Sequence, residues 1–252
     1  MLLDTFENTP FLIDIAFGLT LVTFQYRAIP KGVSLPQRFL STMIVVLAGP
    51  TICSALLGGV PDWLLRQNPS LWFFPLVFAL VHFTRGVVPA IVEWPPIWFA
   101  LSVIGNVGQA SAATTWGCDR VTRHPNSDVA SSFAAMLLVG LLSSTATILV
   151  DSAFNLTKAT WSFSLPHDLF HFPWPSPIRS GLFMTVFYAI ATDPHHVVTS
   201  SPLLPVETAK DVCFAFVVTH YIASELYDRW GRATPSSGDK KSGKTKATKK
   251  EQ

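Results

Sequence analysis

Residues 129–150 read VASSFAAMLLVGLLSSTATILV. None of these residues is charged, and a helix of about 20 apolar residues is long enough to cross the hydrocarbon core of a bilayer. Six other apolar stretches predict further spanning helices, at residues 10–26, 39–57, 71–88, 96–115, 177–192 and 209–227. The sequence therefore predicts an all-α membrane protein with seven transmembrane helices.

The overall composition agrees with this prediction. Of the 252 residues, 49% are hydrophobic, 12% are aromatic and only 13% are charged, and the mean hydropathy is +0.38. A soluble domain carries roughly 25% charged residues, which cover its surface. The composition argues against a soluble enzyme, and no nucleic-acid partner is expected.

Positive charge is concentrated at the C-terminal end of the chain. The last 21 residues hold seven basic and two acidic side chains, whereas the rest of the chain is slightly acidic. This tail is rich in Lys, Ser and Gly and has almost no apolar residues, so it cannot form a core. We therefore expect a seven-helix transmembrane domain at residues 1–230 and a disordered, lysine-rich cytosolic tail at residues 231–252.

Basic residues in short loops predict the orientation, because they lie preferentially on the cytosolic side. With seven spans, the loops on the side of the tail contain or adjoin Arg27, Lys31, Arg38, Arg85, Lys158 and Arg179. The loops on the other side contain or adjoin Arg66, Arg120, Arg123 and Lys210. The N-terminus is therefore predicted to be lumenal and the C-terminus cytosolic.

The last four residues suggest a compartment. Lys249 and Lys250 are the fourth and third residues from the end. This spacing resembles a dilysine signal for retrieval to the endoplasmic reticulum, a short C-terminal address read by a receptor. The alternative is a polybasic segment held near anionic lipid headgroups. The first interpretation predicts a protein of the endoplasmic reticulum or another internal membrane.

Small and hydroxylated residues within the apolar stretches are candidates for a pore. Such residues either allow close helix packing or line a hydrated pathway. A proline in the second stretch is expected to kink that helix, and interrupted or polar helices in both halves of a chain indicate a site near the middle of the membrane. The candidate residues are Gly49, Pro50, Gly108, Gln109, Ser143, Ser144, Thr147 and Asp151.

Titratable residues within the apolar stretches are further candidates, because charge is costly there. Asp14 lies near the beginning of the first stretch and is expected to reach the lumenal interface. Arg85 lies near the end of the third stretch, where it either reaches the cytosolic headgroups or acts as a gate. His82, three residues earlier, would share its helical face. The two side chains would line a polar path or contact a polar neighbour.

Histidine pairs raise a different class of function. His167 and His171 flank Asp168, and His195 adjoins His196. These side chains could serve a membrane-embedded enzyme that acts on lipids. Neither pair has a third metal ligand nearby, and the chain has no motif of a hydrolase, a metalloprotease or a phosphate-binding loop. We therefore expect no metal, no cofactor and no enzymatic activity.

Several short motifs resemble those of the trimeric intracellular cation (TRIC) channel family. The first stretch leads into a turn with Arg27, Pro30 and Gly32, the second ends in LLGGVP at residues 56–61, and the sixth begins with PSPIRSG at residues 175–181. The order and spacing match over about residues 11–227. The resemblance implies two inverted three-helix repeats plus a seventh helix, assembled as a homotrimer.

The fourth stretch departs from the family pattern. TRIC channels carry a lysine-glutamate-valine motif with spaced basic residues there, which anchors a phosphoinositide, whereas residues 105–112 read GNVGQASA. A lysine- and glycine-rich element of the fifth helix is replaced by Ser143, Ser144 and Thr145. The difference argues against phosphoinositide binding, unless Arg85 or Arg120 substitutes.

The resemblance implies a function in ion transport. A TRIC-like chain would pass potassium or a similar monovalent cation through an internal membrane, as a counter-ion during calcium release or uptake. Its pore would lie between the second and fifth helices. The alternatives are the lipid-modifying enzyme and a non-conducting membrane scaffold protein.

Overall fold

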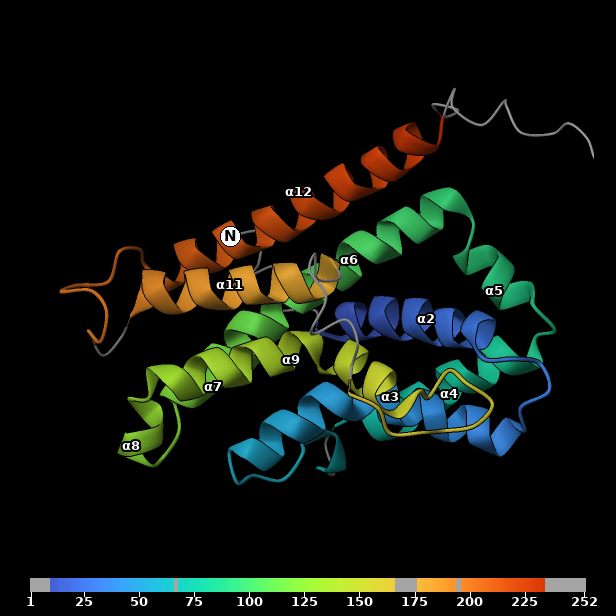
Figure 1. Ribbon diagram of the computed structural model, residues 1–252, viewed down its shortest axis with the longest axis horizontal. Coiled ribbons are helices and arrows are strands. Elements are labelled where there is room, and N and C mark those ends of the chain that lie inside the picture. The colour runs from blue at the N-terminus through green and yellow to red at the C-terminus, as the bar shows by residue number, and fades with distance from the viewer. Residues whose placement is uncertain (1–9, 66–67, 166–175, 194–195, 234–252) are drawn as a thin grey trace, which may run out of the picture.

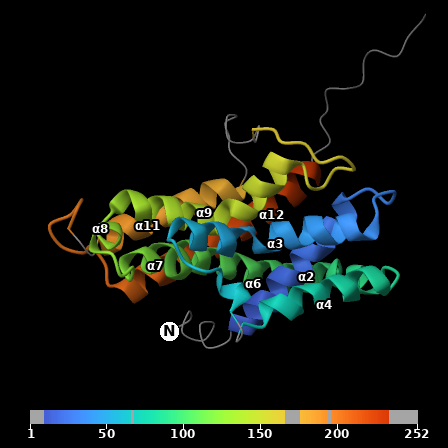
Figure 2. The same ribbon diagram turned by 90° about the horizontal axis from the view of Figure 1, so that it is seen from below.

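The computed structural model describes residues 10–65, 68–165, 176–193 and 196–233, and these residues form helices and no strands (Figure 1). The long helices lie side by side along the longest axis of the molecule (Figures 1 and 2). The α-helices are α2 (Pro10–Ala28), α3 (Leu35–Leu56), α4 (Ser70–Phe83), α5 (Val87–Val92), α6 (Pro95–Ala113), α7 (Asp119–Thr122), α8 (Ser127–Ala130), α9 (Phe133–Phe154), α11 (Ser176–Thr192) and α12 (Val206–Ala233). A 3₁₀-helix, η1, spans Asp62–Leu64, and a π-helix, η2, spans Thr114–Cys118.

Local sequence explains where the long helices begin and end. The hydroxyl oxygen of Ser34 accepts a hydrogen bond from the N–H of Gln37 and caps α3, and Ser132 caps α9 in the same way. Such caps satisfy N–H groups that lack a partner within the helix. Prolines at the first positions of α6 begin that helix without losing a hydrogen bond. Helix α9 ends at Asn155, whose φ of 49° is left-handed.

Among the described residues, three helices are long and apolar enough to cross a membrane, over Phe11–Ala28, Leu35–Leu56 and Phe133–Phe154. Helix α4 is apolar but shorter. Large apolar side chains are also exposed on the outside of the molecule, among them Phe24, Leu40, Leu76 and Leu138. These helices and exposed surfaces make the chain a multi-pass membrane protein.

The third predicted stretch, residues 71–88, differs from the structure because it is not one helix. Helix α4 ends at Phe83, and the chain passes through Arg85 at φ 53° and Gly86 at φ 91° before α5 begins. Two successive residues with positive φ cannot continue a right-handed helix. Arg85 is therefore not on the helix of His82, and the prediction that both share a helical face was wrong.

The fourth and fifth predicted stretches also differ in detail. Helix α6 passes into the π-helix η2, in which the N–H of Asp119 donates to the carbonyl of Thr114, five residues earlier. The stretch at residues 129–150 begins within α8, and the long helix α9 starts only at Phe133. The hydroxyl of Ser132 provides the cap that separates α9 from α8.

Two hydrophobic cores hold the helices together. The aromatic core joins α2, α3 and α4, and its buried members are Val22, Val46, Phe73, Phe74, Val77, Phe78 and Val81. The small-residue core joins α6, η2, α7, α9, α11 and α12, and its buried members include Ala110, Ala113, Cys118, Val139, Ala189 and Cys213. Helix α3 contributes to both cores, through Val46 and Cys53.

Candidate functional site

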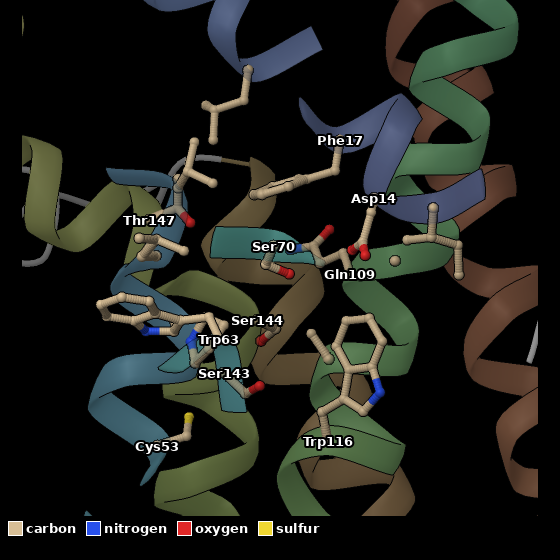
Figure 3. Close-up of a pocket in the computed structure, with 18 of the residues that line it drawn as sticks. Asp14, Phe17, Cys53, Trp63, Ser70, Gln109, Trp116, Ser143, Ser144 and Thr147 are labelled. Carbon is tan, nitrogen blue, oxygen red and sulfur yellow. The ribbon is translucent and has the colours of Figure 1, made fainter. Parts of the chain in front are cut away.

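A cavity of about 490 Å³ lies between the two cores. Its walls come from α2, α3, α6 and α9, with further residues from α4, η1, η2, α7 and α11. Figure 3 shows Cys53, Ser143 and Thr147 on one side of the cavity and Asp14, Gln109 and Trp116 on the other. The cavity is therefore enclosed by helices that are far apart in the sequence.

The structure brings seven of the ten predicted pore residues to this cavity. They come from three different helices, and their side chains or backbones line one continuous space. They are Gly49, Pro50, Gly108, Gln109, Ser143, Ser144 and Thr147. Their role in conduction stays a prediction, but the structure shows that they line the same cavity.

Glycines allow the helices around the cavity to approach closely. A methyl group at Gly49 would lie 3.1 Å from the carbonyl oxygen of Ser143 on α9. A methyl group at Gly108 on α6 would lie only 2.7 Å from Cγ2 of Ile13 on α2. Close approach of backbones is the usual reason for small residues between membrane helices. These two positions therefore set the spacing of the cavity walls.

The second wall-forming helix, α3, contains Pro50 without ending there. Proline has no N–H, so the carbonyl of Val46, one turn earlier, has no partner within the helix. Val46 itself lines the cavity. The interruption of the helical hydrogen bonds therefore lies beside the cavity.

One hydroxyl group of the cavity wall, that of Ser144, uses its proton within its own helix. Ser144 donates from Oγ toward the carbonyls of Gly140 and Leu141, at 3.1 Å and 3.0 Å. A hydroxyl that donates its proton to a carbonyl keeps lone pairs as acceptors. Oxygen acceptors are the groups that hard cations prefer. The Ser144 hydroxyl can therefore offer lone pairs to a cation, whereas its proton is not available to an anion.

Gln109 has a different environment from the hydroxyls. Its Nε2 donates to the carbonyl of Pro177 at 2.8 Å, and its Oε1 accepts from the hydroxyl of Ser180 at 3.3 Å. Both partners belong to the first turns of α11. Gln109 therefore ties α6 to α11 at the edge of the cavity.

Asp14 lines the cavity, whereas the sequence suggested a position at the lumenal interface. It extends from α2 toward the side chains of Gln109 and Ser70 (Figure 3). This is a carboxylate at an otherwise weakly charged cavity wall. The sequence pointed to Asp14 because a charged side chain within an apolar stretch is energetically costly.

An ion pair lies at the edge of the cavity, between two connectors. Nη1 and Nη2 of Arg120 on α7 donate to the two carboxylate oxygens of Asp62 on η1, at 3.1 Å and 3.2 Å. The neighbouring Trp63 donates from Nε1 to the hydroxyl of Thr51 on α3 at 3.0 Å. These contacts hold η1 against the cavity, as a strap formed by residues 58–65. Sequence reasoning missed Asp62 and Trp63, because nothing in the connector indicates its partner.

Three predicted pore residues lie outside the cavity lining. The ring of His82 stacks on Phe78 at a centroid distance of 3.8 Å and meets Tyr26 edge-on at 5.1 Å. Arg85 is exposed on the turn between α4 and α5. Asp151 lies on α9 one turn beyond Thr147. His82 is thus part of the aromatic packing, and Arg85 does not face the cavity.

The other predicted residues fall mostly outside the described residues. His167, Asp168, His171, His195, Lys249 and Lys250 all lie there, as does most of the predicted tail. Helix α12 extends to Ala233, three residues past the expected domain boundary. Within the part of the chain that the structure describes, no group of three or more His, Cys, Asp or Glu residues could hold a metal ion.

Comparison with protein-family models and with curated proteins gave no match. Three solved structures are similar over most of the chain. The first is a TRIC counter-ion channel described for its activity in calcium release, with a TM-score of 0.68 at 15% identity over 86% of this chain and 92% of that one.

The other two are structures of a trimeric intracellular cation channel from C. elegans. The one without calcium has a TM-score of 0.63 at 18% identity over 86% of this chain and 90% of the other. The calcium-bound one has a TM-score of 0.66 at 16% identity over 85% and 90%. The resemblance seen in the sequence is confirmed at the level of structure, and the chain has the fold of the trimeric intracellular cation channels.

Proposed function

We propose that this protein is a cation channel of an internal membrane that passes potassium or a similar monovalent cation. The observation that carries the proposal is the cavity within a TRIC fold, lined by Asp14 and by the hydroxyls of Ser143, Ser144 and Thr147. A carboxylate and oxygen acceptors favour cations, because they replace water molecules of the hydration shell. The physiological role would be counter-ion flow during calcium release or uptake.

The proposed architecture follows the same fold. Seven spans form two inverted three-helix repeats plus a seventh helix within residues 1–230, followed by a cytosolic tail at residues 231–252. Three copies assemble as a homotrimer, and each protomer has its own pore between α3 and α9. The glycine contact between Gly49 and Ser143 supports this location, because it joins α3 and α9 beside the cavity.

The proposed orientation and compartment rest on charge in the sequence. The N-terminus would be lumenal and the C-terminus cytosolic, with Lys249 and Lys250 as a retrieval signal for the endoplasmic reticulum. Replacing both lysines by serine tests the signal. Imaging the full-length chain in cells should show escape to later compartments, and an unchanged distribution would exclude it.

Interaction with membrane lipids is expected to be general rather than specific. Residues 105–112 include no basic side chain, and Arg120 is engaged by Asp62. Phosphoinositide binding is therefore not part of the proposal. Vesicles with and without phosphoinositide should bind the purified protein equally.

The deciding experiment is electrical recording of the purified full-length protein in planar bilayers. A salt gradient of potassium chloride should give a reversal potential close to that of potassium. Absence of conductance at every voltage, or a preference for chloride, would exclude the channel. A protein that is trimeric but silent would instead favour the non-conducting scaffold, and lipid turnover that requires His167 and His171 would favour the enzyme.

A further inference from the structure

Two acceptor oxygens without a hydrogen-bond partner lie near the end of α9. The side chain of Gln25 on α2 is 1% exposed and lies beside the carboxylate of Asp151, which the backbone N–H of Thr157 also approaches. Within the described residues, Oε1 of Gln25 and Oδ1 of Asp151 are both buried and accept no hydrogen bond. A buried acceptor without a partner costs free energy. Both oxygens therefore have acceptor capacity that no described residue uses.

The position of Asp151 strengthens this argument. It lies in the last turn of α9, where the carbonyl groups without helical partners carry the negative end of the helix dipole. That last turn contains no basic residue. A carboxylate at this end of a helix is repelled unless a cation is bound nearby.

The neighbouring helix α3 does not supply that charge through Arg38. Oγ of Ser41 donates to the carbonyl of Leu156 at 2.9 Å, which places the beginning of α3 beside the end of α9. Arg38, less than one turn before Ser41, gives its hydrogen bonds to the carbonyls of Val33 and Pro30, at 3.0 Å and 2.7 Å. The nearest arginine on α3 is thus engaged by backbone oxygens of its own loop.

The two residues continue the surfaces that line the cavity. Ser143, Thr147 and Asp151 are spaced by four residues and share one face of α9. On α2, Leu21 lines the cavity and Gln25 follows four residues later. Both helices therefore lead from the cavity to the same pair of side chains, one turn further on.

We propose that Gln25 and Asp151 form a binding site for a partly dehydrated monovalent cation. The site offers one carboxylate and one amide oxygen. Calcium sites usually combine several carboxylates and carbonyls, so a single carboxylate suits a monovalent ion. The inference rests on the proposed channel function, because it places this site on the route of the ion beyond the cavity.

Recording of the full-length protein in potassium chloride gives the first test. Asp151→Asn should lower the unitary potassium conductance at least about threefold, because a fixed charge at a narrow site concentrates its counter-ion. Asp128→Asn, the same change at an exposed residue of α8, is the matched control and should leave the conductance unchanged. Gln25→Glu adds a second carboxylate and should slow the release of the ion.

A second measurement does not require conduction. The purified protein in detergent should unfold at a higher temperature in potassium than in N-methyl-D-glucamine, a cation too large for the site. Asp151→Asn should abolish this difference, Gln25→Glu should increase it, and Asp128→Asn should preserve it. Asp151→Glu keeps the charge and controls for misfolding.

The two measurements separate the site from the channel. Stabilisation by potassium that requires Asp151, in a protein that never conducts, would support the site and exclude the channel. A conducting protein in which Asp151→Asn changes neither conductance nor stabilisation would overturn the site and leave the channel standing. Stabilisation by calcium but not by potassium would also overturn the assignment to a monovalent ion.

Discussion

The aromatic core and the small-residue core hold their helices together in different ways. In the aromatic core, rings pack edge to face, as Phe39 does on Phe78 at a centroid distance of 5.1 Å. In the small-residue core, backbones meet almost directly, since a methyl group at Gly117 would lie 2.5 Å from the Cα atom of Gly140. Rings can shift to accommodate a change, whereas backbones in contact cannot. The cavity therefore lies between the aromatic core, which can adjust, and the small-residue core, which is rigid.

The largest expected effect tests the polar part of the small-residue core. Asp119 accepts a hydrogen bond from the hydroxyl of Tyr188 at 2.5 Å and pairs with Lys210 at 3.2 Å, and the Lys210 side chain is 4% exposed. Asp119→Asn should destabilise the protein by about 3 kcal/mol, because it removes a charged partner from a buried lysine. Thermal unfolding in detergent measures the loss.

The matched control for Asp119→Asn is an exposed ion pair near the aromatic core. Arg27 on α2 and Glu93, which follows α5, form two hydrogen bonds at 2.7 Å and 2.6 Å. Both side chains are at least a third exposed to solvent, so Glu93→Gln should cost less than about 1 kcal/mol. Equal losses in the two variants would contradict the difference between a buried and an exposed pair.

The next prediction compares one glycine from each core. Gly117→Ala should cost about 1–3 kcal/mol, because its methyl group would meet the backbone of Gly140 and neither chain can move freely. Gly18→Ala should change stability by less than about 1 kcal/mol, because its methyl group would lie 3.2 Å from the ring edge of Phe73. Similar losses at both positions would mean that the aromatic core is as rigid as the other.

The strap at residues 58–65 provides a smaller effect. Arg120→Gln removes the ion pair with Asp62, and an exposed pair contributes at most about 1 kcal/mol, so opening of the strap should increase no more than about fivefold. Cys53 lines the cavity and reports this opening. Its labelling by a maleimide, followed by mass spectrometry, should be faster in Arg120→Gln than in wild type.

Two variants sharpen the strap experiment. Arg123→Gln changes an exposed arginine of the same segment that does not contact Asp62, and should not alter the labelling rate. The double exchange Arg120→Asp with Asp62→Arg should restore slow labelling. Fast labelling in the exchanged pair would show that the ion pair does not hold the strap.

The last prediction concerns Asp193, which follows α11. Burial alone would raise the pKa of this carboxyl, but hydrogen bonds from the N–H groups of Val197, Val198 and Thr199 and from the Thr199 hydroxyl lower it to about 2. An unfolded aspartate has a pKa of about 3.9. Its ionised form therefore stabilises the fold at neutral pH, and this contribution disappears as the pH falls from about 4 toward 2.

The difference in unfolding temperature between wild type and Asp193→Asn measures this contribution. It should be constant between pH 7 and pH 5, and should shrink on further acidification. A difference that grows as the pH falls would contradict the sign of the shift. Circular dichroism in detergent can measure the unfolding temperatures of both proteins at each pH.

Seven residues of the cavity wall could be predicted from the sequence, and the reason is physical. Glycine, proline and hydroxyl residues are conspicuous within apolar stretches, so Gly49, Gly108 and Ser143 could be selected without knowledge of their neighbours. The membrane character and the helical fold followed from the apolar stretches themselves. These signals are local, and the fold preserves them.

Features that depend on partners distant in sequence could not be predicted. Asp62 and Arg120 are 58 residues apart, and both lie in connectors where charged residues are common. The break at Gly86 was hidden by the apolar residues 87–92, which extend the hydrophobic pattern across the turn. Lys210 was counted among the loop charges, because it lies at the beginning of an apolar stretch, and no role was predicted for Asp119.

The π-helix η2 determines the angular position, around the helix axis, of the residues that follow it. A π turn is equivalent to one residue inserted into an α-helix, so it rotates the next residues by about 100° relative to a regular continuation. Asp119 and Arg120 are the first two residues after it. Deleting one residue from Thr114–Cys118 would turn Asp119 away from Lys210 and Arg120 away from Asp62 together. One inserted residue thus keeps two ion pairs in angular register, one in the small-residue core and one at the edge of the cavity.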